Sequence, residues 1–183
     1  MDSFFDSFDL FEIDSSDSSD YLDSYELLSY KSIHDVINDP GLCVAVKFSL
    51  NTVHALDVYA RHLKLPNLLN PSEYHTTIVY SRKPVKQYPC LDTLSTPIIN
   101  KGWRNLTILG TDKLVVAVEF KSTFLQLRHQ IAKRLGASFD YPQYKPHITL
   151  TKTLPPGYKL PQNPPQFDYP ITIVKEYTEP LKP

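Results

Sequence analysis

The sequence is poor in cysteine: it holds only Cys43 and Cys90, far apart and outside any C-x-x-C pattern. No histidine stands beside them at metal-ligand spacing, so a structural zinc site is not expected. Long hydrophobic runs are also lacking, since no apolar stretch approaches the ~18 residues of a membrane helix. The N-terminus is acidic where a signal peptide is basic. These absences favour a soluble protein of a reducing cytoplasm with no membrane partner.

Basic residues are missing from the first 30 positions, which hold nine Asp and Glu, whereas the 11 other acidic residues and all 19 Lys and Arg follow. Residues 1–30 repeat Asp, Ser and aromatics without a helical or strand period, and we expect an acidic, disordered tail over 1–38 before a domain at 39–183. The tail is either a docking segment for a protein partner or an unspecific solvated tail. The body, at +8, suits a polyanionic ligand such as a nucleotide, but also an ordinary soluble surface.

Strands and helices alternate along the body. A short helix over 32–37 is expected to lead in, and the expected strands are 42–48, 74–81, 104–110, 114–120, 147–152 and 169–177. A helix capped by Ser49 or Asn51 runs to about Lys64 and shares an apolar face made of Val53, Leu56, Ala60 and Leu63. A second helix begins after Ser122 and ends at Gly136, with an apolar stripe of Leu125, Leu127, Ile131 and Leu135.

An internal repeat appears when the sequence is compared with itself at an offset of 72 residues. VAVKF (44–48) falls on VAVEF (116–120), ARHL (60–63) on AKRL (132–135), and HTTI (75–78) on HITL (147–150), without a gap. Strand, helix and H-x-T strand therefore recur in the same register. This pattern predicts an α+β domain made of two pseudo-symmetric β-α-β halves.

The two H-x-T motifs are the candidate catalytic residues: His75 with Thr77, and His147 with Thr149. With six histidines, chance gives only about 0.4 such matches, and the two found here occupy equivalent places in the repeat. Side chains at i and i+2 of a strand project from one face, so each motif presents an imidazole beside a hydroxyl. A lone motif would be read as local hydrogen bonding, but the matched pair indicates one shared site.

Two imidazoles suit phosphodiester cleavage. One takes a proton from the attacking oxygen and the other gives one to the leaving oxygen, and a free imidazole titrates near pH ~6.5. The Thr hydroxyls are expected to hold the non-bridging phosphate oxygens and stabilise the charge of the transition state. No metal and no cofactor are required, and the body contains no Asp, His and Glu cluster at ligand spacing.

The paired motifs resemble those of the two-histidine (2H) phosphoesterase superfamily, over about residues 41–177. The resemblance implies a bilobal fold with antiparallel sheets around a central cleft, and a metal-independent hydrolase. Thr76 stands where the motif usually has an apolar residue. Within the superfamily the chain is most similar to the phage anti-CBASS protein 1 family, which degrades the cyclic di- and trinucleotide signals of bacterial immunity. The resemblance to this family rests on the segments LPNLLNPSEYHTTIVYSRKP, KGW (101–103), YKPHITL and VKEY.

That resemblance also implies ligand contacts for Trp103 and Glu176, although Trp103 is equally compatible with sheet core and Glu176 with an exposed strand end. The family's base-contacting aromatic in the first strand has no clear counterpart, since Cys43 stands there. From position alone, Lys145 is either a phosphate ligand or a solvated lysine. Tyr74 and Tyr144 flank the motifs, where they would stack on bases or pack at the rim of the cleft.

Three functions follow from these patterns. The first is a phosphodiesterase that hydrolyses 3′-5′ bonds of cyclic di- and trinucleotides such as 3′,3′-cGAMP, in the cytoplasm of an infected bacterium and without a stable nucleic-acid complex. The second keeps the chemistry but acts on 2′,3′-cyclic phosphate ends of RNA or on 2′-5′ bonds. The third is a non-catalytic nucleotide-binding or virion-associated module. Histidine and threonine in both halves argue against the third, because phosphate binding alone does not need two titrating groups.

Overall fold

The computed structural model describes residues 40–94, 98–100 and 102–181, with the side chains of 98–100 left out. The predicted tail at 1–38 and the predicted helix at 32–37 lie outside these residues. Within the described part of the chain, no helix is long and apolar enough to cross a membrane.

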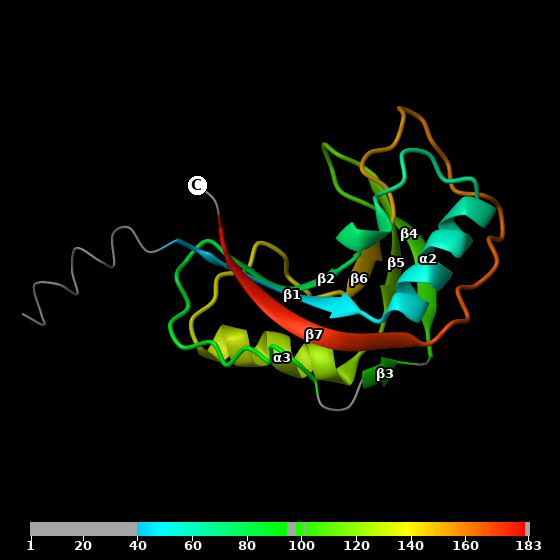
Figure 1. Cartoon of the computed structure of the whole chain (residues 1–183). Coiled ribbons are helices and arrows are strands. Elements are labelled where there is room, and N and C mark those ends of the chain that lie inside the picture. The colour runs from blue at the N-terminus through cyan, green and yellow to red at the C-terminus, as the bar shows by residue number, and fades with distance from the viewer. Residues whose placement is uncertain (1–39, 95–97, 101, 182–183) are drawn as a thin grey trace, which may run out of the picture. The chain divides into compact units, whose positions relative to one another are not determined.

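The first sheet has four antiparallel strands in the order β2-β1-β7-β3. β1 (Leu42–Phe48) lies between β2 (Thr76–Ser81) and the long β7 (Ile171–Pro180), and β3 (Ile98–Asn100) pairs with the beginning of β7. Figure 1 shows β7 curving alongside β1 over most of its length. β1 is central because its apolar, β-branched sequence suits burial, and Val44, Ala45 and Val46 are all buried.

The second sheet has three antiparallel strands in the order β4-β5-β6: β4 (Arg104–Leu109), β5 (Val115–Phe120) and β6 (His147–Thr149). It reproduces the register of the first sheet. Ala45 pairs with Thr77 in the first, and Ala117 pairs with Thr149 in the second, each 72 positions further along. The two-half α+β architecture predicted from the sequence repeat is therefore confirmed at the level of strand pairing.

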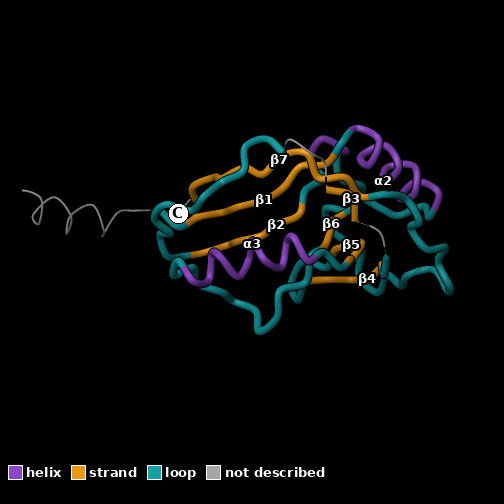
Figure 2. Tube along the Cα trace, turned by 90° about the horizontal axis from the view of Figure 1, so that it is seen from below, coloured by secondary structure: helices purple, strands orange, loops and turns teal. Residues whose placement is uncertain are grey.

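Each helix packs on the sheet of the other half. α3 (Thr123–Arg134) runs along the four-stranded sheet (Figure 1, Figure 2), where His129 bonds to the Ile78 carbonyl. α2 (Leu50–His62) lies by the three-stranded sheet, where Tyr59 lines a cavity together with Leu106 and Val118. This exchange joins both halves into one hydrophobic core.

The predicted helix caps are confirmed. The Ser49 hydroxyl accepts from the Thr52 amide, and the Ser122 hydroxyl accepts from the Leu125 amide. Gly136 follows α3 with a φ of +93°, the left-handed conformation that a glycine tolerates at a helix end.

The apolar stripe predicted for α3 is wrong in part. Leu127 and Leu135 are 53% and 41% exposed, and the residues that α3 buries are Leu125, Arg128, His129 and Ala132. The reason is that α3 faces polar partners on the sheet, the Ile78 carbonyl and the Glu176 carboxylate, so polar residues occupy its inner face. On α2 the predicted face holds, with Leu56 and Ala60 buried and Val53 and Leu63 packed against the core.

Near the motifs, the observed strand boundaries differ from the predicted ones. β2 begins at Thr76 because a 3₁₀ turn, η1 (Pro71–Glu73), precedes it, and β6 ends at Thr149, earlier than the predicted Lys152. The segment beyond β6 is still held, since Leu150 and Lys152 exchange backbone hydrogen bonds with residues Leu69 and Asn67. Neither η1 nor β3 was expected from the sequence.

Candidate active site

His75 lies immediately before β2, Thr77 lies on β2, and His147 and Thr149 lie on β6, and the burial of the two segments alternates with the strand period. His75, Thr77, His147 and Thr149 are half-buried, whereas the intervening Thr76 and Ile148 are buried. Each histidine is therefore on the same side of its strand as its threonine. Each motif consequently presents an imidazole and a hydroxyl on one partly accessible face.

The two imidazoles are held in the same way. His75 Nδ1 lies 2.7 Å from the Glu73 carbonyl oxygen, and His147 Nδ1 lies 2.8 Å from the Lys145 carbonyl oxygen. A carbonyl only accepts, so each Nδ1 carries a hydrogen and donates it. Nε2 is then the nitrogen left for proton transfer, as a base when the ring is neutral and as an acid when it is protonated.

Hydrogen bonds between the halves bring the motifs side by side. The Thr76 hydroxyl donates to the His147 carbonyl at 2.8 Å, and the Tyr144 hydroxyl donates to the Thr77 carbonyl at 3.0 Å. Thr76 is 1% exposed, so this bond is shielded from water. The polar middle residue of the first motif, which departs from the usual pattern, thus fixes the backbone of the second motif.

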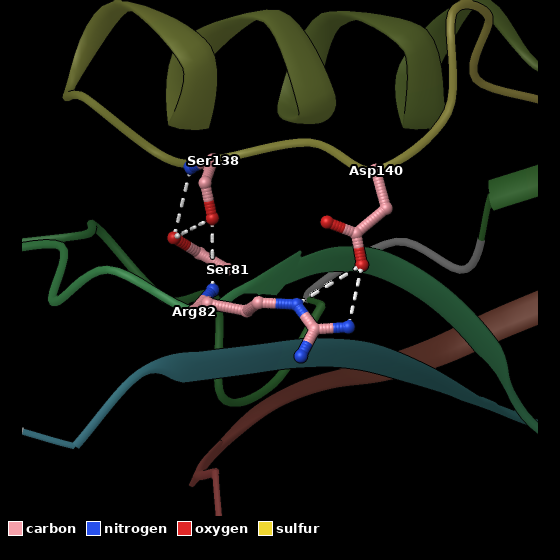
Figure 3. A network of polar contacts seen from close by, with 4 residues as sticks. All are labelled: Ser81, Arg82, Ser138 and Asp140. Carbon is pink, nitrogen blue, oxygen red and sulfur yellow. Dashed lines mark hydrogen bonds and ion pairs between the residues drawn. The ribbon is translucent and has the colours of Figure 1, made fainter.

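Further contacts hold β2 along its free edge. The buried His129 bonds to the Ile78 carbonyl at 2.8 Å, and burial lowers its pKa, which favours the neutral ring. At the far end Ser138 bonds to Ser81 and to the Arg82 amide, and Arg82 pairs with Asp140 at 3.0 Å (Figure 3). The unpaired edge of β2 is thereby covered by α3 and the segment after it, and the strand that carries Thr77 is fixed in place.

Two of the expected ligand contacts lie in the interior. The Glu176 side chain is 0% exposed, and the Arg128 guanidinium binds its carboxylate with two hydrogen bonds of 2.9 and 2.7 Å. The reason is strand register: Glu176 pairs with Val46 on β1, whose side chain is in the core. Tyr74 is 1% exposed, and burial raises its pKa to about 12. As placed here, neither side chain offers a surface to a ligand.

Tyr144 is placed differently from a base-stacking residue. One face of its ring is stacked on His129, with centroids 4.1 Å apart and planes at 8°, and burial raises its pKa well above the ordinary tyrosine value. Its hydroxyl is bound to the Thr77 carbonyl. In this arrangement Tyr144 supports the first motif from the opposite half.

Trp103 and Lys145 are accessible. Trp103 is 47% exposed and lines a cavity of about 330 Å³, and the Lys121 ammonium lies 5.6 Å from its ring centroid. Lys145 is exposed two residues before His147. Both side chains are accessible to a ligand, and the lining of the Trp103 cavity includes none of the four motif residues.

The charged neighbours of the histidines were missed by sequence reasoning. Glu119 on β5 is the direct partner of His147, and the equivalent position in the other half is Lys47. Comparing charged residues 72 positions apart would have revealed that the positive charge of Lys47 is replaced by the negative charge of Glu119. Among the described residues, no group of three or more His, Cys, Asp or Glu side chains is arranged to hold a metal ion.

We expect Thr76→Val to lower kcat by about tenfold, because a small displacement of the His147 backbone moves an imidazole out of reacting geometry. Thr76→Ser, which keeps the hydroxyl, should retain most of the activity. The matched control is Thr52→Val, since Thr52 is equally buried and its hydroxyl also binds a backbone carbonyl, that of Pro170, at 3.1 Å. Thr52→Val should lose at least as much thermal stability as Thr76→Val, because the Thr52 hydroxyl also accepts from the Thr172 amide at 3.0 Å. Equal kcat values in the two variants would show that the Thr76 bond has no role in the site.

A family model described as anti-CBASS protein Acb1 matches residues 40–183. The anti-CBASS protein Acb1 of Yersinia phage phiR1-RT is 37% identical over 144 residues, covering 78% of this chain and 89% of that protein. The protein of the same name from Enterobacteria phage T4 is 35% identical over 143 residues, with the same coverage. Among solved structures, E. coli LigT complexed with NADP+ is similar at a TM-score of 0.50 and 13% identity, covering 78% of this chain and 95% of that one, a likeness of fold alone.

Proposed function

The chain belongs to the anti-CBASS protein Acb1 family, and from this premise we propose that it hydrolyses 3′-5′ bonds of cyclic di- and trinucleotide immune signals such as 3′,3′-cGAMP. It is a phosphodiesterase of the anti-CBASS type. Because the relatives named above come from phages, we propose that it acts in the cytoplasm of an infected bacterium. The part of the chain that performs the chemistry is proposed to be the domain at 39–183, with the acidic tail dispensable.

The observation that carries the proposal is the equivalent hydrogen bond of His75 and His147 to the carbonyl two residues before each. Both rings keep Nε2 for proton transfer, so one can remove the proton of the attacking oxygen while the other protonates the leaving oxygen. Thr77 and Thr149 bind the non-bridging oxygens of the scissile phosphate, where negative charge increases in the transition state. No step requires a metal-bound water, and we propose that the reaction is metal-independent.

Two further substrate contacts, Trp103 and Lys145, are proposed because their side chains are exposed. Trp103 offers an accessible ring for stacking on a base, and Lys145 offers an ammonium beside the second motif. A compact cyclic ligand would need a closed cleft that grips both bases. An RNA end would need an open groove for the rest of the strand.

The substrate is tested by comparing kcat/KM for 3′,3′-cGAMP with that for a short oligonucleotide ending in a 2′,3′-cyclic phosphate. We expect the protein to prefer cGAMP, and we expect Trp103→Ala to lower kcat/KM for cGAMP by about tenfold. Exhaustive dialysis against EDTA should leave turnover unchanged. A preference for the oligonucleotide, together with indifference to Trp103→Ala, would assign the protein to RNA ends. Activity restored only by Mg²⁺, Mn²⁺ or Zn²⁺ would exclude the two-histidine mechanism, and no turnover of either substrate would leave a binding module.

A further inference from the structure

Two lysines lie directly opposite each other on the sheet face that carries the first motif. Lys47 on β1 is the cross-strand partner of Lys175 on β7. Ala45, two residues before Lys47, is the partner of Thr77, so Lys47 projects from the same face as Thr77 and His75. The Lys47 ammonium donates to the Ser72 carbonyl at 2.9 Å, three positions before His75, which places it at the histidine end of the strand.

This lysine pair places two positive charges on neighbouring strands, a position that an anion would stabilise. Like charges directly opposite each other in an antiparallel pair repel. Over the residues described, neither ammonium has a carboxylate within ion-pair distance, and the ion pairs of this part of the chain are all formed by arginines. Lys175 is exposed, and the Lys47 ammonium, 5.7 Å from the Tyr177 ring centroid, has two N–H groups beyond the one given to Ser72.

The repeat does not reproduce this lysine pair in the second half of the domain. The position equivalent to Lys47 in the repeat is Glu119, so the two-fold pattern that gives both halves an H-x-T motif does not give both halves a lysine. The two ammonium groups therefore make the face beside His75 positive, whereas the direct strand partner of His147 is the Glu119 carboxylate, with the Lys145 ammonium exposed two residues before that histidine. A site that bound a single phosphate symmetrically would not need this difference.

We propose that Lys47 and Lys175 bind a second, non-scissile phosphate of the substrate while the two H-x-T motifs hold the scissile one. The inference rests on the proposed function, because cyclic di- and trinucleotides carry two or three phosphates. β2, β1 and β7 are consecutive strands, so the lysines stand about 5 and 10 Å from the His75 strand. Ammonium groups suit this task, because they attract a phosphate as point charges without a fixed orientation.

The test uses the full chain and two nucleotides that differ in phosphate number. Lys47→Met and Lys175→Gln should each raise KM for 3′,3′-cGAMP by about tenfold, since each removes one charged contact to phosphate, with kcat within about twofold. Neither should change the inhibition constant of 2′,3′-cyclic AMP, which has one phosphate, as a competitor of cGAMP turnover. Lys47→Arg should retain most of the affinity, because the charge and donors remain.

The matched control is Lys113→Gln, an exposed lysine in the turn between β4 and β5 that should leave both quantities unchanged. Thermal unfolding of each variant verifies that the fold is kept. A KM for cGAMP that stays at the wild-type value, or an equal loss for cGAMP and 2′,3′-cyclic AMP, would overturn the second-phosphate site. If wild-type protein turns over no cyclic dinucleotide, the proposed function itself fails, and that result is distinct from a failure of the lysine pair.

Discussion

Replacing His75 or His147 with alanine is expected to lower kcat by at least about a hundred-fold. Each imidazole has its Nδ1 bound to a backbone carbonyl, and its Nε2 is the only nitrogen left to move a proton. The two rings are placed by equivalent contacts, so removing either should abolish one of the two proton transfers. We expect the Thr77→Ala and Thr149→Ala variants to lose less, because they remove phosphate contacts and leave proton transfer intact.

The measurement is steady-state turnover of 3′,3′-cGAMP against pH. The wild-type profile should be bell-shaped, because one imidazole must be neutral and the other protonated at the same time. His54→Ala and His62→Ala on α2 serve as controls, since neither belongs to an H-x-T motif. A folded His75→Ala or His147→Ala protein with near-normal turnover would refute the two-histidine assignment.

The second large effect concerns stability. We expect Arg128→Met to lower the free energy of unfolding by about 3–5 kcal/mol, because the Glu176 carboxylate would stay buried without its guanidinium. The Arg128 and Glu176 side chains are 7% and 0% exposed. For a domain of this size the expected fall in melting temperature is roughly 10 °C or more.

The control is Arg82→Met, which removes an ion pair whose side chains are 71% and 42% exposed and should change stability by less than about 1 kcal/mol. The double variant Arg128→Met with Glu176→Leu should regain much of the loss, since an apolar pair can replace a buried ionic one. Calorimetry with and without cGAMP separates the two roles of Glu176. If Glu176→Gln keeps the wild-type melting temperature but loses cGAMP binding, Glu176 is a ligand contact as the family resemblance implies, and the buried pair is not its main role.

The sequence alone determined the two-half architecture and the identity of the motif residues. An offset of 72 residues aligned strand, helix and H-x-T in both halves, and the strand pairing has the same offset. Helix caps at Ser49 and Ser122 were also predictable. The physical reason is that strand period, capping and repetition are local or periodic properties, so the order of residues is sufficient to reveal them.

Only the tertiary structure decided how the halves meet. The sequence of α3 favoured Leu127 and Leu135 as core, but its inner face carries Arg128 and His129, because their partners Glu176 and Ile78 come from β7 and β2. Likewise Tyr144, adjacent to a motif, supports Thr77 across the interface, and Lys175 meets Lys47 from a strand nearly 130 residues further along. Such contacts join residues distant in the chain, and their choice depends on packing and strand register, which no local pattern contains.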